Sequence, residues 1–129
     1  MIVVDASALV DALTGVAGSE SLRSRLAGEE IHAPMLIDFE VVSAVRGMSL
    51  GGHLSAGRAE EVLIDFDDLP LHRWRAEAAL RHRAFSLRNN LSAYDAAYVA
   101  LAEALECPLV TTDAPLSRSL GHQADILML

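Results

Sequence analysis

Four carboxylate residues stand in apolar stretches of this 129-residue sequence, at points where a strand ends or a helix begins. They are Asp5 in IVVDASALV, Glu40 in PMLIDFEVVSAV, Asp95 in NNLSAYDAAYVAL and Asp113 in PLVTTDAPLS. An ionised carboxylate next to apolar packing costs free energy unless something pairs with it. No basic residue adjoins any of the four, and a divalent metal ion would satisfy them all at once.

The chemistry of such a site follows from its ligands. Carboxylates without histidine or cysteine partners suit Mg²⁺ or Mn²⁺ and argue against zinc. Clustered acids repel one another, so without metal at least one of them should hold a proton more readily than usual. An acid-held Mg²⁺ with open positions activates water and stabilises charge on a phosphoryl group and its leaving oxygen. The four acids therefore indicate phosphodiester hydrolysis.

Each acid also has a purely structural interpretation. Asp5 or Asp113 could cap the helix that follows it, because aspartate is favoured at that position. Asp95 could complete a capping box with Ser92 and favour the positive end of its helix. Glu40 could be a solvated residue between two apolar faces. A shared role is favoured by their setting, since the other acids fall in polar or boundary stretches, among them Glu29, Glu30, Glu60, Glu61, Asp67 and Asp68.

Short apolar segments alternate with amphipathic ones along the chain. We expect strands at Ile2–Val4, Ile31–Ala33, Leu69–Leu71, Leu109–Thr112 and Ile126–Leu129. We expect helices at Ser7–Leu13, Ser19–Leu26, Leu36–Met48, Ser55–Phe66, Arg75–Leu87, Ser92–Leu105 and Ala114–Leu120. Alternation of this kind predicts an α/β fold with a parallel sheet covered on both faces. No linker or internal repeat is present, so residues 1–129 are predicted to form a single domain.

The predicted order of elements brings the four acids to one place. In an open α/β sheet the ligand crevice lies beyond the carboxyl ends of the strands. Asp5 and Asp113 directly follow two of the predicted strands, whereas Asp95 and Glu40 lie near the starts of two helices. If those helix starts face the same edge of the sheet, all four carboxylates converge.

The bulk composition predicts a globular cytoplasmic protein. Hydrophobic residues make up 52% of the chain, which argues against disorder. No apolar run approaches the roughly 18 residues of a membrane span, and the first residues lack the basic region of a signal peptide. A single cysteine, Cys107, excludes a disulfide framework within the chain.

The net charge of −8 argues against broad electrostatic binding of nucleic acid, but the distribution of the basic residues weakens that argument. Every basic residue is an arginine, and five of the ten lie between Arg73 and Arg88. Arginine binds phosphate through two parallel hydrogen bonds. Either a solvated helix face or an RNA contact accounts for this segment.

In all four acidic segments the sequence resembles PIN-domain nucleases, most closely the VapC-type toxins of bacterial toxin–antitoxin pairs. The matching segments are IVVDASALV, APMLIDFEVVSAVR, LSAYDAAYVALAEAL and CPLVTTDAPLSR, in the family's order and spacing. The resemblance implies a PIN-like three-layer α/β/α sandwich with a short, mostly parallel central sheet. It also implies an endoribonuclease that needs Mg²⁺ or Mn²⁺, cuts RNA such as transfer or ribosomal RNA, forms homodimers and is inhibited by a cognate VapB-type antitoxin.

Carried over by position, the resemblance makes Asp5, Glu40, Asp95 and Asp113 the metal ligands, with Ser7 and Thr112 as neighbours that orient water or a carboxylate. Two positions depart from the family pattern. Ser43 stands where asparagine is common, and residues 114–118 lack a further acid that sometimes follows the last aspartate. We therefore expect one firm metal site and a second only with substrate. For the antitoxin we expect a basic side chain placed among the acids, with apolar contacts near Leu9–Leu13 and Val62–Phe66.

Two other classes of protein remain to be weighed. A catalytically inactive PIN-like module would bind RNA or protein without cutting, although all four acids are intact. A phosphatase of the haloacid dehalogenase type needs a second aspartate two residues after the first, and it needs a lysine. Here the residue two positions after Asp5 is Ser7, and the chain has no lysine.

Several other residues that could take part in catalysis or binding do not form a recognisable functional motif. Gly47–Gly51 matches G-x-S-x-G but is predicted to end a helix rather than to join a strand to a helix. The five histidines show no metal-ligand spacing and are expected at surface or boundary positions. Trp74 and Tyr94 are more typical of packing residues than of base-stacking platforms.

Overall fold

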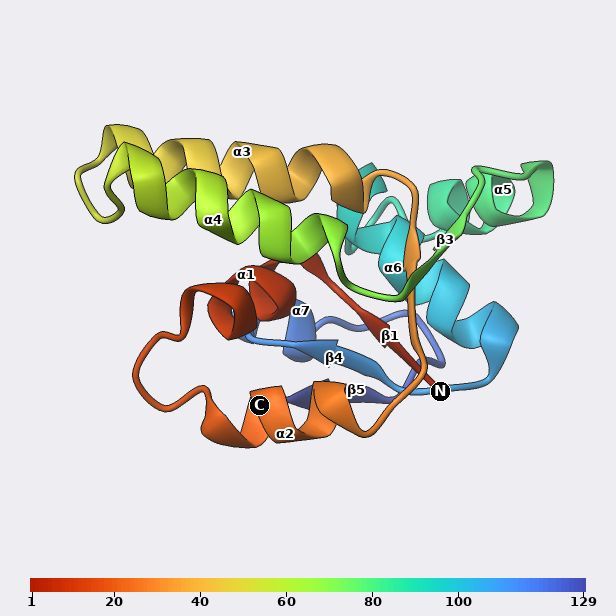
Figure 1. The fold of residues 1–129 in the computed structure, drawn as a ribbon. Coiled ribbons are helices and arrows are strands. Elements are labelled where there is room, and N and C mark those ends of the chain that lie inside the picture. The colour runs from red at the N-terminus through yellow and green to blue at the C-terminus, as the bar shows by residue number, and fades with distance from the viewer.

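A five-stranded parallel sheet forms the centre of the computed structural model, which describes residues 1–129 (Figure 1). The strand order is β3-β2-β1-β4-β5, and every neighbouring pair is parallel. The strands are short: β1 Ile2–Val4, β2 Ile31–Pro34, β3 Leu71–Trp74, β4 Leu109–Thr111 and β5 Ile126–Met128. The central strands are fully buried, as is typical of parallel sheets covered on both faces.

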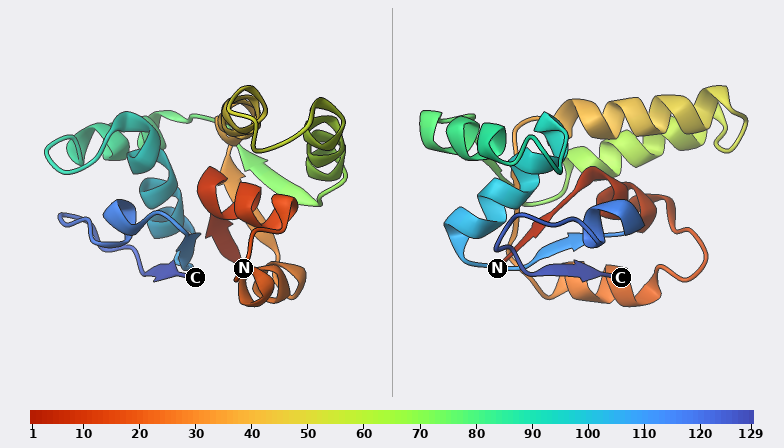
Figure 2. Two further views of the ribbon diagram at one scale, coloured as in Figure 1. Left: turned by 90° about the vertical axis from the view of Figure 1, so that its left-hand side faces the viewer. Right: turned by 180° about the vertical axis from the view of Figure 1, so that it is seen from behind.

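Seven helices surround the sheet: α1 Ala6–Thr14, α2 Glu20–Ala27, α3 Ile37–Leu50, α4 Ala56–Asp67, α5 Ala78–Ser86, α6 Ala93–Leu105 and α7 Ala114–Ser117. Helix α6 packs on β1, β2 and β4 and carries α5 on its outer side, whereas α1, α2 and α4 lie on the opposite face (Figure 2). Helices α3 and α4 run side by side as a long projecting hairpin (Figure 1). This arrangement confirms the three-layer α/β/α prediction.

Capping side chains fix where the helices near the sheet edge begin. Asp5 caps α1 by accepting the Ala8 N–H at 2.9 Å. Ser92 caps α6 by accepting the Asp95 N–H at 3.2 Å. Both bonds satisfy amide groups that would otherwise have no partner in the first helical turn. They also place Asp5 and Asp95 at the same end of the molecule as the carboxyl ends of the strands.

The structure corrects the predicted segment between residues 69 and 87. The strand is Leu71–Trp74 rather than Leu69–Leu71, and it pairs with β2 residue by residue from Ile31↔Leu71 to Pro34↔Trp74. The helix that follows begins at Ala78 instead of Arg75. The arginines of this segment are therefore divided among a strand, a connection and a helix, and they do not form one helix face.

Two further expectations are corrected. In the stretches 9–13 and 62–66, Leu9, Val62 and Phe66 are at most 4% exposed and belong to the core, whereas Ile64 is 58% exposed. Apolar contact of an antitoxin with these stretches stays a prediction, and it is limited to their exposed residues. His32 is a buried residue of β2 instead of a surface residue. No helix is both long enough and apolar enough to cross a membrane.

Candidate active site

Asp5 lies at the end of β1 and is held by three hydrogen bonds. Its Oδ1 accepts from the Ser7 hydroxyl at 2.8 Å as well as from the amide that it caps, and its Oδ2 accepts from the Thr111 hydroxyl at 2.5 Å. Burial raises the pKa of the Asp5 carboxyl above its usual value, and the negative charge of Asp113 adds to that shift, while the three hydrogen bonds oppose it. Asp5 is therefore a helix cap and a nearly buried anion at once.

Glu40 lies one turn into α3, where it faces α6. The Tyr98 hydroxyl donates to Glu40 Oε1 at 2.6 Å. Burial raises the pKa of Glu40, the negative charges of Asp95 and Asp5 raise it further, and the bond from Tyr98 opposes both. The pKa of Tyr98 itself is raised far above its ordinary value by burial and by Glu40, so the phenol keeps its proton and donates it to the Glu40 carboxylate.

Asp95 and Asp113 complete the set from two further elements. Asp95 lies in the first turn of α6, directly over the cap Ser92. Burial raises the pKa of the Asp95 carboxyl, the charge of Asp113 raises it further, and the Ser92 hydroxyl opposes both. Asp113 follows β4 and caps the short helix α7 through the Leu116 N–H at 3.3 Å. Asp5 and Asp113 are therefore both helix caps, as the structural interpretation predicted. Capping does not neutralise their carboxylates, so their charges still act on the site.

The four carboxylates form one electrostatic group, here called the acidic cluster. Asp113 acts on Asp5 and Asp95, and both Asp5 and Asp95 act on Glu40. None of the four takes part in any ion pair of the chain, because all six pairs involve other acids. The shared negative charge therefore has no counterion within the chain.

The donor set fits a hard divalent cation. No three of the acidic-cluster carboxylates bring one oxygen each within 4.8 Å of one another, so the cluster is not a tight all-protein cage. Mg²⁺ usually keeps several waters and takes only one or two carboxylates directly, which matches an open arrangement of this kind. The chemistry of the residues present is thus consistent with Mg²⁺ or Mn²⁺.

Thr111 is a site residue that the sequence analysis missed. Its hydroxyl donates to Asp5 and accepts the Asp113 N–H at 2.9 Å, so it links two members of the acidic cluster. The neighbouring Thr112 contributes only its backbone N–H, which donates to the Ser7 hydroxyl at 3.4 Å. The sequence pattern that could have identified Thr111 is the alternation of side chains along a strand, which places Thr111 and Asp113 on one side and Thr112 on the other.

Replacing Thr111 with valine is expected to lower the free energy of unfolding by about 1–3 kcal/mol. The substitution keeps the shape of the fully buried side chain but leaves Asp5 and the Asp113 amide each short of a partner. Urea unfolding followed by circular dichroism measures the change. The matched variant Thr112→Val should change the free energy of unfolding by less than about 0.5 kcal/mol, and an equal loss in both variants would contradict the assignment.

Tyr98 was also missed, although it lies three residues after Asp95 and therefore on the neighbouring helical position. Replacing it with phenylalanine removes the only hydrogen bond to the Glu40 carboxylate and leaves the packing of the ring in place. Since the loss of outer partners of metal ligands typically costs 10–100-fold in metal affinity, we expect a Mn²⁺ affinity roughly 10-fold or more lower. Calorimetric titration with Mn²⁺ tests this, and an unchanged affinity would exclude the positioning role.

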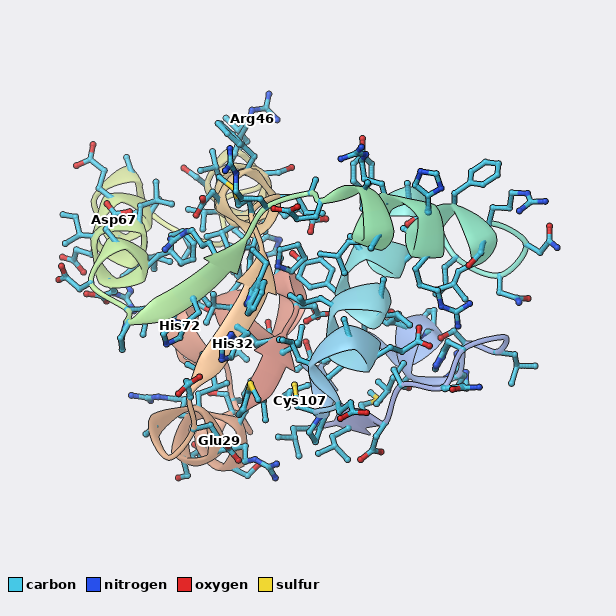
Figure 3. All side chains as sticks on the ribbon, turned by 90° about the vertical axis from the view of Figure 1, so that its right-hand side faces the viewer. Glu29, His32, Arg46, Asp67, His72 and Cys107 are labelled. Atoms are coloured by element: carbon cyan, nitrogen blue, oxygen red, sulfur yellow. The ribbon has the colours of Figure 1, made fainter.

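A second group of potential ligands lies elsewhere, on β2 and β3. One ligand atom each from Glu30, His32 and His72 lies within 4.8 Å of the others, and Figure 3 shows the two histidines side by side on neighbouring strands. The Trp74 indole N–H donates to His32 Nδ1 at 2.9 Å, and His32 Nε2 lies 2.6 Å from Glu30 Oε1. Because an indole is only a donor, His32 must accept at Nδ1 and carry its proton on Nε2.

This protonation argues against a metal at the second group. A metal-ligating histidine normally donates its other ring N–H outward, whereas Nδ1 of His32 is already an acceptor. The rings of His32 and His72 are also stacked, with centroids 4.6 Å apart and planes within 18°, so their in-plane lone pairs do not converge on one ion. The group instead orients Trp74.

Comparison with known proteins agrees with this fold. A sequence profile of the PIN domain matches residues 2–119. The chain belongs to the PIN domain family. Among curated PIN-domain relatives, ribonuclease VapC12 of Mycobacterium tuberculosis is 40% identical over 126 residues, which cover 98% of this chain and 97% of the relative. Ribonuclease VapC9 of the same organism is 43% identical over 126 residues, covering 98% and 96% of the two chains.

A solved structure shows that the PIN-domain fold extends to more distant proteins. VapBC2 from Rickettsia felis, solved bound to a DNA fragment from its promoter, superposes with a TM-score of 0.68 at 16% identity. The match covers 98% of this chain and 98% of that one. At this identity the likeness concerns the fold alone.

Proposed function

We propose that this PIN domain is the endoribonuclease toxin of a VapBC-type toxin–antitoxin pair. The reaction is hydrolysis of RNA phosphodiester bonds with Mg²⁺ or Mn²⁺ held by Asp5, Glu40, Asp95 and Asp113. The observation that carries the proposal is the acidic cluster, whose charge has no counterion in the chain. Burial and the charges of neighbouring acids raise the pKa values of three of its members, Asp5, Glu40 and Asp95. Full-length ribonuclease relatives at about 40% identity support the same activity.

Some residues of the site would bind the metal, and others hold those ligands in position. Bound among these carboxylates, the metal would supply an activated water and charge stabilisation for the phosphoryl group. Ser7 and Thr111 hold both oxygens of Asp5 in place, and Tyr98 holds Glu40. Because residues 114–118 offer no further acid, we propose one firm metal site, with a second ion retained only beside substrate.

The proposed substrate is RNA of the transfer or ribosomal class. The chain's net charge of −8 disfavours extended contact with the phosphate backbone. Recognition would therefore depend on a few arginines and on the shape and unpaired bases of the RNA. We further propose a homodimer in the bacterial cytoplasm.

A VapB-type antitoxin is the proposed protein partner. An uncompensated acidic cluster attracts a basic side chain strongly, so an arginine or lysine of the antitoxin would neutralise it and block the metal. A complex in which Mn²⁺ binds the toxin as tightly as it binds the free chain would contradict this mode of inhibition.

The direct test is to incubate the purified protein with total bacterial RNA in the presence of Mg²⁺, Mn²⁺ or excess chelator. Discrete fragments that form only with metal would support the nuclease, and mapping their ends would identify the target. Metal binding without any cleavage, across structured and unstructured RNA, would instead favour the inactive binding module.

A further inference from the structure

An apolar cavity of about 430 Å³ opens at the same edge of the sheet as the acidic cluster. It lies beyond the ends of β2 and β3 and is closed by α5 and by the starts of α3 and α6. Its lining is mostly hydrophobic and includes Pro34, Met35, Leu36, Trp74, Phe85 and Tyr94. The proposed reaction does not use this cavity.

Its position follows from the parallel sheet. Asp5 and Asp113 follow β1 and β4, whereas Pro34 and Trp74 end β2 and β3, so all these residues lie at one edge. Since neighbouring strands are about 5 Å apart, the cavity is displaced from Asp5 by roughly one to two strand spacings. Tyr94 in its wall also directly precedes Asp95 of the acidic cluster.

The aromatic residues of the cavity are poorly covered by the chain. Phe85 is 68% exposed, Tyr94 66% and Trp74 38%, so the expectation that Trp74 and Tyr94 are packing residues does not hold. Trp74 is nevertheless fixed, because His32 accepts its indole N–H and is itself bonded to Glu30. An oriented, exposed aromatic side chain offers a stacking face at little entropic cost.

Two arginines of the cavity have no acidic partner. Arg75 and Arg81 both line it and neither forms an ion pair, whereas Arg73 is bound to Asp38 and Arg83 to Glu103. Arg81 donates instead to the Ala76 carbonyl. In a chain of net charge −8, unpaired guanidinium groups beside exposed aromatic rings match a ligand that is both flat and anionic.

We propose that this cavity binds an unpaired nucleobase of the RNA substrate next to the scissile phosphate, with Arg75 and Arg81 contacting the phosphate of that nucleotide. Stacking of bases on aromatic side chains together with arginine–phosphate contacts is a general mode of single-strand recognition. This inference rests on the proposed ribonuclease function and names the part of the substrate that the protein reads.

Trp74 is the chain's only tryptophan, so its fluorescence reports directly on the cavity. The probe is a short single-stranded RNA of mixed sequence, titrated into the full-length protein in excess chelator to prevent cleavage. We expect saturable quenching. Tyr94→Ala and Arg81→Ala should each weaken binding by about 5–100-fold, as expected for the loss of one stacking or phosphate contact. Tyr94→Phe, which keeps the ring, should bind like the wild type.

The matched control is Arg46→Ala, which removes an exposed, unpaired arginine on α3 outside the cavity (Figure 3). Its affinity for the RNA should be unchanged. In the cleavage assay with Mn²⁺, Tyr94→Ala should raise KM more than it lowers kcat. This split separates substrate binding from damage to the acidic cluster.

The outcomes separate the cavity from the nuclease. Metal-dependent cleavage of total RNA by the wild type, with no quenching and no change of KM in either cavity variant, would overturn the base-binding proposal and leave the ribonuclease intact. Emission that shifts with protein concentration in the absence of RNA would show that a second copy fills the cavity, which also overturns it. Quenching by RNA without any metal-dependent cleavage would support base binding in the cavity and contradict the proposed ribonuclease activity.

Discussion

Replacing Asp95 with asparagine is expected to reduce metal-dependent RNA cleavage by at least about 100-fold. The Asp95 carboxylate takes part in no ion pair, and its one polar neighbour within the chain is the Ser92 hydroxyl. The isosteric amide therefore removes the negative charge, keeps an oxygen that can accept from Ser92, and leaves the cap of α6 in place. Outer partners of metal ligands are typically worth 10–100-fold, and a direct ligand should be worth more. The measurement is the initial rate of fragment formation at saturating Mn²⁺.

The control for this prediction is Asp67→Asn, which makes the same chemical change at an exposed position at the end of α4 (Figure 3). It should retain wild-type activity. Asp5→Asn should resemble Asp95→Asn, since asparagine still caps α1. Full activity of Asp95→Asn, with cleavage that remains sensitive to chelator, would place the metal elsewhere.

Adding Mn²⁺ is expected to stabilise the wild-type protein at neutral pH, and chelator should reverse the effect. A ligand that binds only the folded state contributes about 2.7 kcal/mol when its concentration is 100 times its Kd. For a domain of this size that corresponds to a rise in Tm of roughly 10 °C. Differential scanning calorimetry with and without chelator gives the shift directly.

The pH dependence in chelator has a defined sign. Burial and mutual repulsion raise the folded-state pKa values of Asp5, Glu40 and Asp95, so folding favours their protonated forms. Their contribution to stability is therefore fully present below the ordinary pKa near 4 and is lost as pH rises through the elevated values. Without metal, Asp95→Asn should be more stable than the wild type at pH 7, and the difference should vanish toward pH 4.

Mn²⁺ should remove this advantage, because it stabilises only the protein with the intact acidic cluster. A wild-type Tm that is insensitive to Mn²⁺, or an Asp95→Asn variant less stable than the wild type in chelator at pH 7, would show that the charges are compensated by other groups.

The positions of the site acids could be predicted because they depend on local patterns. Asp5 and Asp113 directly follow short apolar strands, and Asp95 follows the cap Ser92, so topology alone directs them to one edge of the sheet. The error between Thr111 and Thr112 has a physical cause. Side chains alternate along a strand, and a displacement of one residue moves the hydroxyl to the opposite side.

The surroundings of Trp74 could not be predicted from the sequence. Strand β3 is polar and lies at the edge of the sheet, so its residues lack the apolar pattern by which strands are recognised. Its bounds are set by pairing with β2, about 40 residues earlier in the chain. The bond from Trp74 to His32 depends on that register, because Trp74 lies opposite Pro34 and His32 opposite His72.

The central claim is that the acidic cluster holds the metal, and titration with Mn²⁺ followed by electron paramagnetic resonance at neutral pH tests it most directly. The signal of free Mn²⁺ gives the number of bound ions and their Kd without any RNA present. We predict one firmly bound Mn²⁺ per wild-type chain, the same for Asp67→Asn, and an affinity at least about 100-fold lower for Asp95→Asn. Equal affinity in the wild type and Asp95→Asn would contradict the account.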